Sequence, residues 1–143
     1  MTAKEYLRQI RRIDRQLDSL IRERDELERA QTYLQSPQID GDRVQTSPSG
    51  DPPWMGYILK WEKLTEKIGA KWDELIELKM RILTELHELD DNRYVAILVK
   101  RYVEFKSWHK IAYEMNYSID HVFRLHGEAL RAFERRNMTV NDK

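Results

Sequence analysis

Residues 101–130 read RYVEFKSWHKIAYEMNYSIDHVFRLHGEAL, in which two short helical patterns are separated by a tight polar turn. Ser107 is placed to cap a helix from Trp108 to Met115, because a serine hydroxyl accepts hydrogen bonds from the free amides at a helix start. Asn116 tolerates the left-handed backbone that ends such a helix, and Ser118 is a second capping residue. The stretch therefore predicts two helices joined by a turn, the layout of a helix-turn-helix.

The second of these helices is expected over residues 119–135, and its apolar residues repeat at helical spacing. Those expected to pack inward are Ile111, Ala112 and Met115 in the first helix and Val122, Leu125, Ala129, Leu130 and Phe133 in the second. In a helix-turn-helix the first turns of the second helix contact base edges in the major groove of DNA. The residues left to face DNA there are Ser118, Asp120, His121, Phe123 and Arg124.

Each of these residues has a chemistry that fits a DNA contact. Arg124 fits a guanine edge, where its guanidinium binds two acceptors, and Asp120 could accept from cytosine. Ser118 and His121 fit a phosphate or a base. Phe123 fits a thymine methyl group, although packing on the neighbouring helix is an equal alternative. The flanking candidates for phosphate contacts are Lys106, Lys110, Arg131, Arg135 and Arg136.

The net charge of the 143 residues is zero, with 25 basic and 25 acidic residues. The charge is unevenly distributed, because residues 92–138 hold nine Lys and Arg against five Asp and Glu. This modest basic excess coincides with the helix-turn-helix pattern, as a DNA-binding surface requires.

The rest of the chain predicts a helical arm over residues 1–89. Residues 2–35 contain no Gly or Pro. Their heptad-like apolar seam consists of Tyr6, Ile10, Ile13, Leu17, Leu20, Leu27 and Leu34. On the opposite face an arginine repeats every seven positions, at Arg8, Arg15, Arg22 and Arg29. These arginines indicate a solvated face or, alternatively, a basic surface for phosphates or an acidic protein. All four prolines fall in residues 36–53, which predict a long turn or loop.

A second long helix is expected over residues 54–89, antiparallel to the first. Its seam of three-four spacing includes Trp72, and further apolar residues flank that seam. Because one partner helix cannot cover so wide a stripe, either the C-terminal unit folds back on it or a second chain covers it, and of these a homodimer through this helix is the favoured arrangement. The hairpin or dimer interface residues are Ile58, Trp61, Leu64, Ile68, Trp72, Leu75, Ile76 and Leu83. The fold class is therefore all-α: a long antiparallel helical hairpin, a helix-turn-helix over residues 90–138 with a helix at about 91–104, and a tail at 139–143.

Several functions are disfavoured by what the sequence lacks. There is no cysteine, which excludes disulfides and thiolate metal sites and fits a reducing cytoplasm. No apolar run is long enough for a membrane span. No catalytic motif is found, and His87, His109, His121 and His126 make no convincing metal set. We therefore expect no enzyme, no metal, no cofactor and no membrane partner.

The stretch quoted above resembles the C-terminal helix-turn-helix of sigma factors, their region 4. The matching positions are Arg101-Tyr102, Ser107, Ile111-Ala112, Ser118 and Val122. Asn116 replaces the usual turn glycine, and Phe123 and His126 stand where more basic residues are usual. These departures put a sigma-like promoter element in doubt, and the other sigma regions are absent.

The whole chain resembles the ArpU- and RinA-type regulators of late transcription in phages and prophages of Gram-positive bacteria. The segments that match are MTAKEYLRQIRRID, DRVQTSPSGDP and YSIDHVFRLHGEAL. The resemblance implies a regulator, most simply an activator, that binds double-stranded DNA in the host cytoplasm, with host RNA polymerase as a further partner. Two alternatives stay open: a small-terminase-like DNA-packaging protein and a helical adaptor that binds polymerase.

Overall fold

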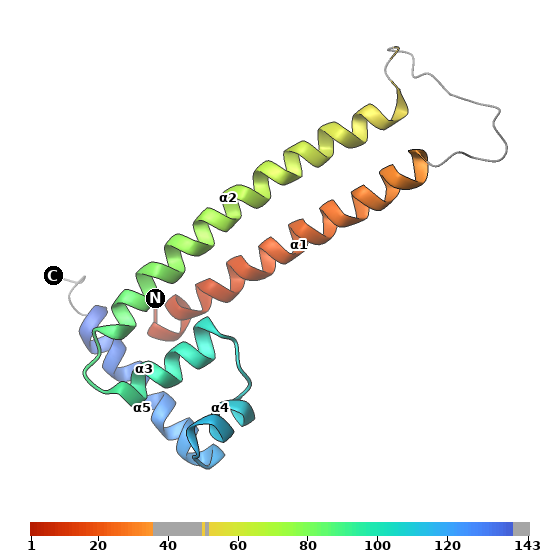
Figure 1. The fold of residues 1–143 in the computed structure, drawn as a ribbon. Helices are drawn as coiled ribbons and strands as arrows, with labels where there is room; N and C mark the ends of the chain where they lie inside the picture. Colours follow the sequence, from red (N-terminus) through yellow and green to blue (C-terminus); the bar gives the residue numbers. More distant parts are fainter. Residues whose placement is uncertain (36–49, 51, 139–143) are drawn as a thin grey trace. The chain divides into compact units, whose positions relative to one another are not determined.

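The computed structural model describes residues 1–35, 50 and 52–138, and this part of the chain is all-helical, as the sequence predicts (Figure 1). The predicted loop at residues 36–53 falls almost wholly outside the described residues, and so does the tail at 139–143. The helices are α1 (Ala3–Gln35), α2 (Pro53–His87), α3 (Asn92–Leu98), α4 (Trp108–Met115) and α5 (Ile119–Asn137), with a π-helical turn, η1 (Val99–Val103), after α3.

Helix α1 begins with a capping box, in which two backbone amides find side-chain acceptors. The Thr2 N–H donates to Glu5 Oε2 at 2.9 Å, and the Glu5 N–H donates to Thr2 Oγ1 at 3.2 Å. This reciprocal pair satisfies amides that have no partner in the first turn of a helix. The hydrogen bond from the Thr2 backbone also lowers the pKa of Glu5.

Helix α2 starts at Pro53, a residue suited to the first helical position because its missing N–H would have no partner there. It ends at His87, two residues earlier than predicted. The Glu88 and Leu89 N–H groups donate to carbonyls three residues back, on Glu85 and Leu86, which tightens the last turn. The Asp90–Asp91 pair follows, and Asp91 caps α3 by accepting from the Arg93 N–H.

The chain divides into two compact units, and both long helices contribute to each of them. Unit 1 comprises Met1–Asp14 and Glu74–Lys143, and unit 2 comprises Arg15–Asp73. The prediction had divided the chain at residue 89. In the structure the first turns of α1 and the last turns of α2 belong with the C-terminal helices.

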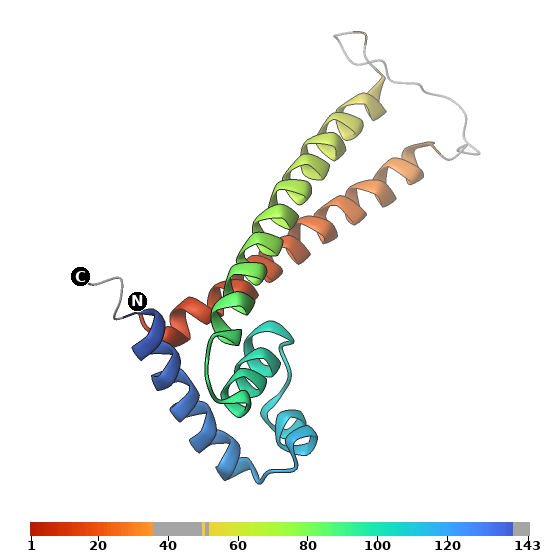
Figure 2. The same ribbon diagram turned by 60° about the vertical axis from the view of Figure 1, so that its left-hand side comes forward.

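Within each unit the segments of α1 and α2 run antiparallel, as Figures 1 and 2 show. In unit 2 Leu17, Leu64 and Ile68 are buried, and the Trp61 Nε1–H donates to Glu28 Oε1 at 2.7 Å. The buried side chains of unit 1 come from all of its helices and include Leu7, Ile10, Leu75, Leu78, Ile82, Leu86, Ile97, Leu98, Tyr102, Ile111, Ala112, Val122, Leu125, Ala129 and Phe133.

The predicted seam of α2 is shifted by about one residue over part of its length. Of the predicted interface residues, Leu64, Ile68 and Leu75 are buried and Ile58, Trp61 and Leu83 are half-buried. Trp72 is 46% exposed and Ile76 is 52% exposed. The buried series steps from Ile68 to Leu75 and Leu78, so Trp72 lies outside it.

The predicted helix at about residues 91–104 is present as the continuous segment of α3 and η1, but in its second half the backbone widens into a π-helix that the sequence did not predict. The Glu104 N–H donates to the Val99 carbonyl and the Lys106 N–H to the Lys100 carbonyl, both at 2.9 Å. These bonds span five and six residues, as in a π turn and its termination. Phe105 then adopts φ +59°, a left-handed conformation that is costly for a bulky residue.

Candidate nucleic-acid interface

The turn between α4 and α5 has the capping geometry that the sequence predicts. Ser107 and Ser118 both have extended backbones, and their Oγ atoms accept from the Lys110 and His121 N–H groups, each at 3.2 Å. Asn116 lies in the left-handed region at φ 58°, ψ 40°. The three predictions for this turn are confirmed.

The apolar faces of α4 and α5 pack as predicted, with two residues less buried than expected. Helix α5 packs against both α3 and α4. The fully buried predicted residues are Ile111, Ala112, Val122, Leu125, Ala129 and Phe133. Met115 and Leu130 are half-buried. This packing fixes which face of α5 remains open.

That open face begins with the predicted DNA-facing residues. Ser118, Asp120 and Arg124 are exposed. His121 is half-buried and stacks on Tyr117 with 4.2 Å between ring centroids and 1° between ring planes. Four of the five candidates, Phe123 among them, thus present substantial surface at the start of α5.

Phe123 satisfies both interpretations that the sequence left open. Its ring meets Trp108 of α4 edge to face at 5.4 Å, yet the residue is 48% exposed. The contact restricts the ring while leaving one side of it accessible.

His126 lies on the opposite face of α5 and is structural. Its Nε2 is hydrogen-bonded to the Tyr102 hydroxyl at 2.8 Å, and its ring lies 4.6 Å from Trp108. Burial, followed by the positive charges of Lys4, Arg101 and Arg8, lowers the pKa of His126 to about 4. The imidazole is therefore neutral near pH 7. The spacing of residues 122, 126, 129 and 133 could have revealed this inward position, since it follows the apolar seam of α5.

Arg101 is a functional candidate that the sequence analysis did not single out. Its guanidinium lies 4.3 Å from the Trp108 ring centroid, and its Nη1 donates to the Lys106 carbonyl at 3.0 Å. The side chain thus fixes a cation beside α4. Its place in the Arg-Tyr pair was noted only as part of a resemblance.

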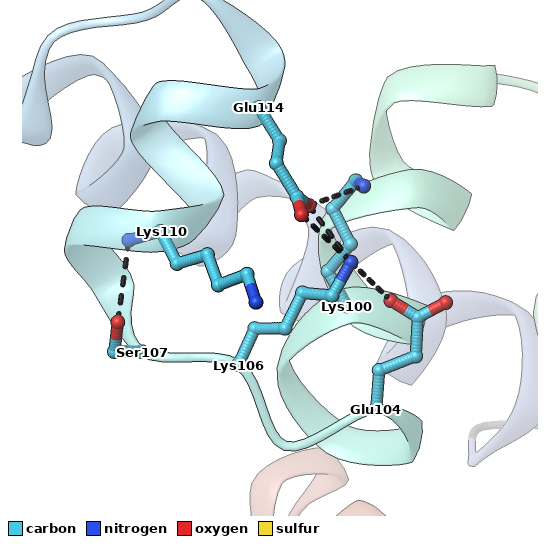
Figure 3. A network of polar contacts seen from close by, with 6 residues as sticks. All are labelled: Lys100, Glu104, Lys106, Ser107, Lys110 and Glu114. Carbon is cyan, nitrogen blue, oxygen red and sulfur yellow. Dashed lines mark hydrogen bonds and ion pairs between the residues drawn. The ribbon is translucent and has the colours of Figure 1, made fainter.

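The flanking basic residues differ in whether their charges are already paired with carboxylates. Lys106 Nζ binds Glu114 at 2.8 Å and Glu104 at 3.0 Å, and Lys100 also binds Glu114 at 2.8 Å (Figure 3). These lysines, Lys100 first, lower the pKa of Glu114 to about 2. The hydrogen bonds that Lys106 donates to Glu114 and Glu104 raise the pKa of Lys106. A phosphate contact by Lys106 therefore requires exchange of its carboxylate partners.

The other predicted phosphate contacts lie on the surfaces of α4 and α5. Lys110 is exposed, and Figure 3 links only its backbone N–H, to Ser107. Arg131 and Arg135 are exposed, and the Arg131 guanidinium lies along α5 beside Gly127. Arg136 pairs with Glu88 at 3.6 Å. Lys110 and Arg131 are thus better placed than Lys106 to meet an anion.

Two other kinds of site were sought over the part of the chain that the structure describes. No group of three or more His, Asp or Glu side chains there could hold a metal ion. No described helix is both long and apolar enough to cross a membrane. Comparison with protein-family models, curated proteins and solved structures found no match.

Proposed function

We propose that this chain is a sequence-specific DNA-binding transcriptional regulator that reads the major groove with the first two turns of α5. One observation supports this most strongly: a serine-capped helix follows a left-handed turn and leaves Asp120, Phe123 and Arg124 exposed at its start. A carboxylate, an aromatic ring and a guanidinium are side chains that discriminate base edges. The N-terminus of α5 also favours nearby phosphate, because its free amides and dipole attract anions.

The resemblance to late phage regulators makes the regulation of late genes, by activation with host RNA polymerase, the specific form of this proposal. A homodimer fits it, because paired recognition helices read paired half-sites. Support for a second copy comes from Trp72, Ile76 and Met80, which follow each other at four-residue steps along α2 and are all exposed. A two-fold axis sets such a stripe against the same stripe of its partner.

A second candidate is a helical adaptor that contacts polymerase and hardly touches DNA. The ion pairs of Lys100 and Lys106 favour it, because they reduce the free positive charge around α4. Tyr113, which is 84% exposed on α4, is also suited to a protein contact.

Binding to DNA duplexes selected from a random pool separates these two candidates. We expect selective binding whose affinity falls steeply with salt. Replacement of Arg124 by Ala should cost roughly 1–3 kcal/mol on the selected site, or about 5- to 150-fold in Kd, and little on random DNA. The matched control Arg131→Ala, which removes a predicted phosphate contact, should weaken both alike.

Two results would count against the proposal. An equal loss on selected and random DNA for Arg124→Ala would show that Arg124 reads no base. Wild-type protein that binds no duplex even at low salt would favour the adaptor.

A further inference from the structure

Five basic side chains of unit 1 lie outside the α4–α5 turn and interact with the rings of Phe105, Trp108 or His126. Three come from the first turns of α1, one from α2 and one from η1: Lys4, Arg8, Arg11, Lys79 and Arg101. We call this set the arm cluster. The three from α1 are exposed, and Lys79 and Arg101 are half-buried.

Two cations of the arm cluster share one aromatic ring. The Arg11 guanidinium lies 5.2 Å from the Phe105 ring centroid, and Lys79 Nζ lies 5.9 Å from the same centroid. An aromatic face attracts a cation through its quadrupole. Phe105 holds this position with a left-handed backbone of φ +59°, so the local conformation brings the ring to two charges at once.

The other three cations act electrostatically on the buried His126. Burial lowers the pKa of His126 most, and the positive charges of Lys4, Arg101 and Arg8 lower it further. Burial raises the pKa of the neighbouring Tyr102, and the positive charges of Arg8 and Arg101 partly offset that rise. The two groups meet at η1, where Arg101 and Phe105 lie four residues apart. The five charges therefore belong to one region of unit 1.

None of the five members of the arm cluster forms an ion pair within the described residues. Three acidic groups of unit 1 have other partners. Glu5 accepts from the Thr2 N–H, although the charge of Arg8 also acts on it; Glu104 binds Lys106; and Glu85 accepts from the Tyr6 hydroxyl. Like charges that lack counter-charges repel each other, and an anion on this surface relieves that repulsion.

We propose that the arm cluster is a second DNA-binding surface, which holds the phosphate backbone while α5 reads the bases. The inference rests on the proposed function and deepens it. Arg101 stacks on Trp108 and Trp108 contacts Phe123, so a chain of contacts links the cluster to the start of α5. Lys4, Arg8 and Arg11 span roughly 10 Å along α1, about three nucleotide steps of one DNA strand.

The salt dependence of DNA binding tests this surface in the full-length protein. Each phosphate contact contributes about 0.9 to the slope of log K against log salt concentration. The triple variant Lys4→Gln, Arg8→Gln, Arg11→Gln should therefore lower the magnitude of the slope by about 2 to 3. It should weaken binding to selected and random duplexes by the same factor, because backbone contacts do not read sequence.

Two control variants separate charge from packing. The charge-retaining variant Lys4→Arg, Arg8→Lys, Arg11→Lys should keep the wild-type slope. The variant Lys60→Gln, Lys63→Gln, Lys67→Gln removes three exposed charges from unit 2 and should also keep it. If the triple variant folds poorly by circular dichroism, the single variant Lys4→Gln should still lower the slope by about 0.9.

The outcomes distinguish this inference from the proposed function. If the wild type binds a selected duplex and the slope survives loss of the three α1 charges, the arm cluster is not a DNA surface and the role of α5 stands. If the triple variant loses binding to polymerase but keeps the wild-type salt slope, the arm cluster binds an acidic protein partner and the inference is overturned. A loss of slope in the charge-retaining variant also contradicts it. If the wild type binds no DNA, both proposals fail.

Discussion

Two histidines five residues apart on α5 have different chemistry because of their surroundings. His121 stacks on Tyr117 at the surface, close to the candidate DNA-facing residues. His126 is buried, hydrogen-bonded to Tyr102 and packed against Trp108. Composition does not distinguish the two histidines. His121 is a candidate DNA contact and His126 is a core residue because only His126 lies on the packed face of α5.

The buried histidine makes stability depend on pH. The pKa of His126 is about 4 in the folded chain, against an ordinary value of 6.5 for a histidine side chain. Between these values the unfolded state binds a proton that the folded state excludes. The stabilisation is therefore complete above about pH 6.5 and is lost as the pH falls through 4, by roughly 1–3 kcal/mol.

Urea unfolding between pH 4 and 8 measures this effect. The variant His126→Gln, which keeps a hydrogen-bonding side chain but does not titrate in this range, should lose most of the pH dependence. An equal fall of the unfolding free energy in the wild type and the variant would assign the acid sensitivity to other groups.

At the scale of elements, local interactions made the α4–α5 turn predictable. The effects of three residues, Ser107, Asn116 and Ser118, are local. Each acts on an amide or a backbone angle within three residues of itself, so the neighbouring sequence is enough to predict its effect. The π turn was not predictable in this way. It ends at Val103, two residues before Phe105, whose left-handed conformation accompanies contacts with Arg11 and Lys79, far away in the chain.

The cap of α5 allows stability and DNA binding to be separated. Ser118→Ala should cost about 0.5–2 kcal/mol of unfolding free energy, because the His121 N–H loses its acceptor. Ser118→Asp should keep most of that stability, since aspartate caps helices well and favours the helix dipole. It should nevertheless weaken DNA binding through repulsion of phosphate.

Thermal unfolding and a binding titration together check this separation, with Ser107→Ala as the matched cap variant on α4. Unchanged DNA binding by Ser118→Asp would place the start of α5 away from DNA. An equal loss of stability in the Ala and Asp variants would show that the cap contributes little.

At the scale of the whole molecule, the sequence predicted the all-helical fold and the apolar excess of α2, but not which side chains remain exposed. A heptad seam and a helix of 3.6 residues per turn drift apart over many turns. Trp72 fits the predicted seam yet is exposed, and Ile76 and Met80 are exposed as well. Contacts of α1 with the C-terminal helices, including Tyr6 against Phe133 at 5.9 Å, had no local signal in the sequence.

These exposed residues predict a concentration-dependent dimer. Sedimentation equilibrium at micromolar concentration should give a dimer for the wild type and a monomer for Trp72→Glu, Ile76→Glu, because a buried unpaired carboxylate is costly. The control Gln16→Glu, Ser19→Glu places two charges on exposed positions of α1 and should remain dimeric. A monomeric wild type would exclude a dimer at these concentrations.

An NMR titration of the labelled protein with a selected duplex shows whether the first turns of α5 meet DNA. Backbone amide shifts should change most over residues 117–125 and fall off along the rest of α5. Changes confined to residues 15–73, or no changes at saturating DNA, would contradict that contact.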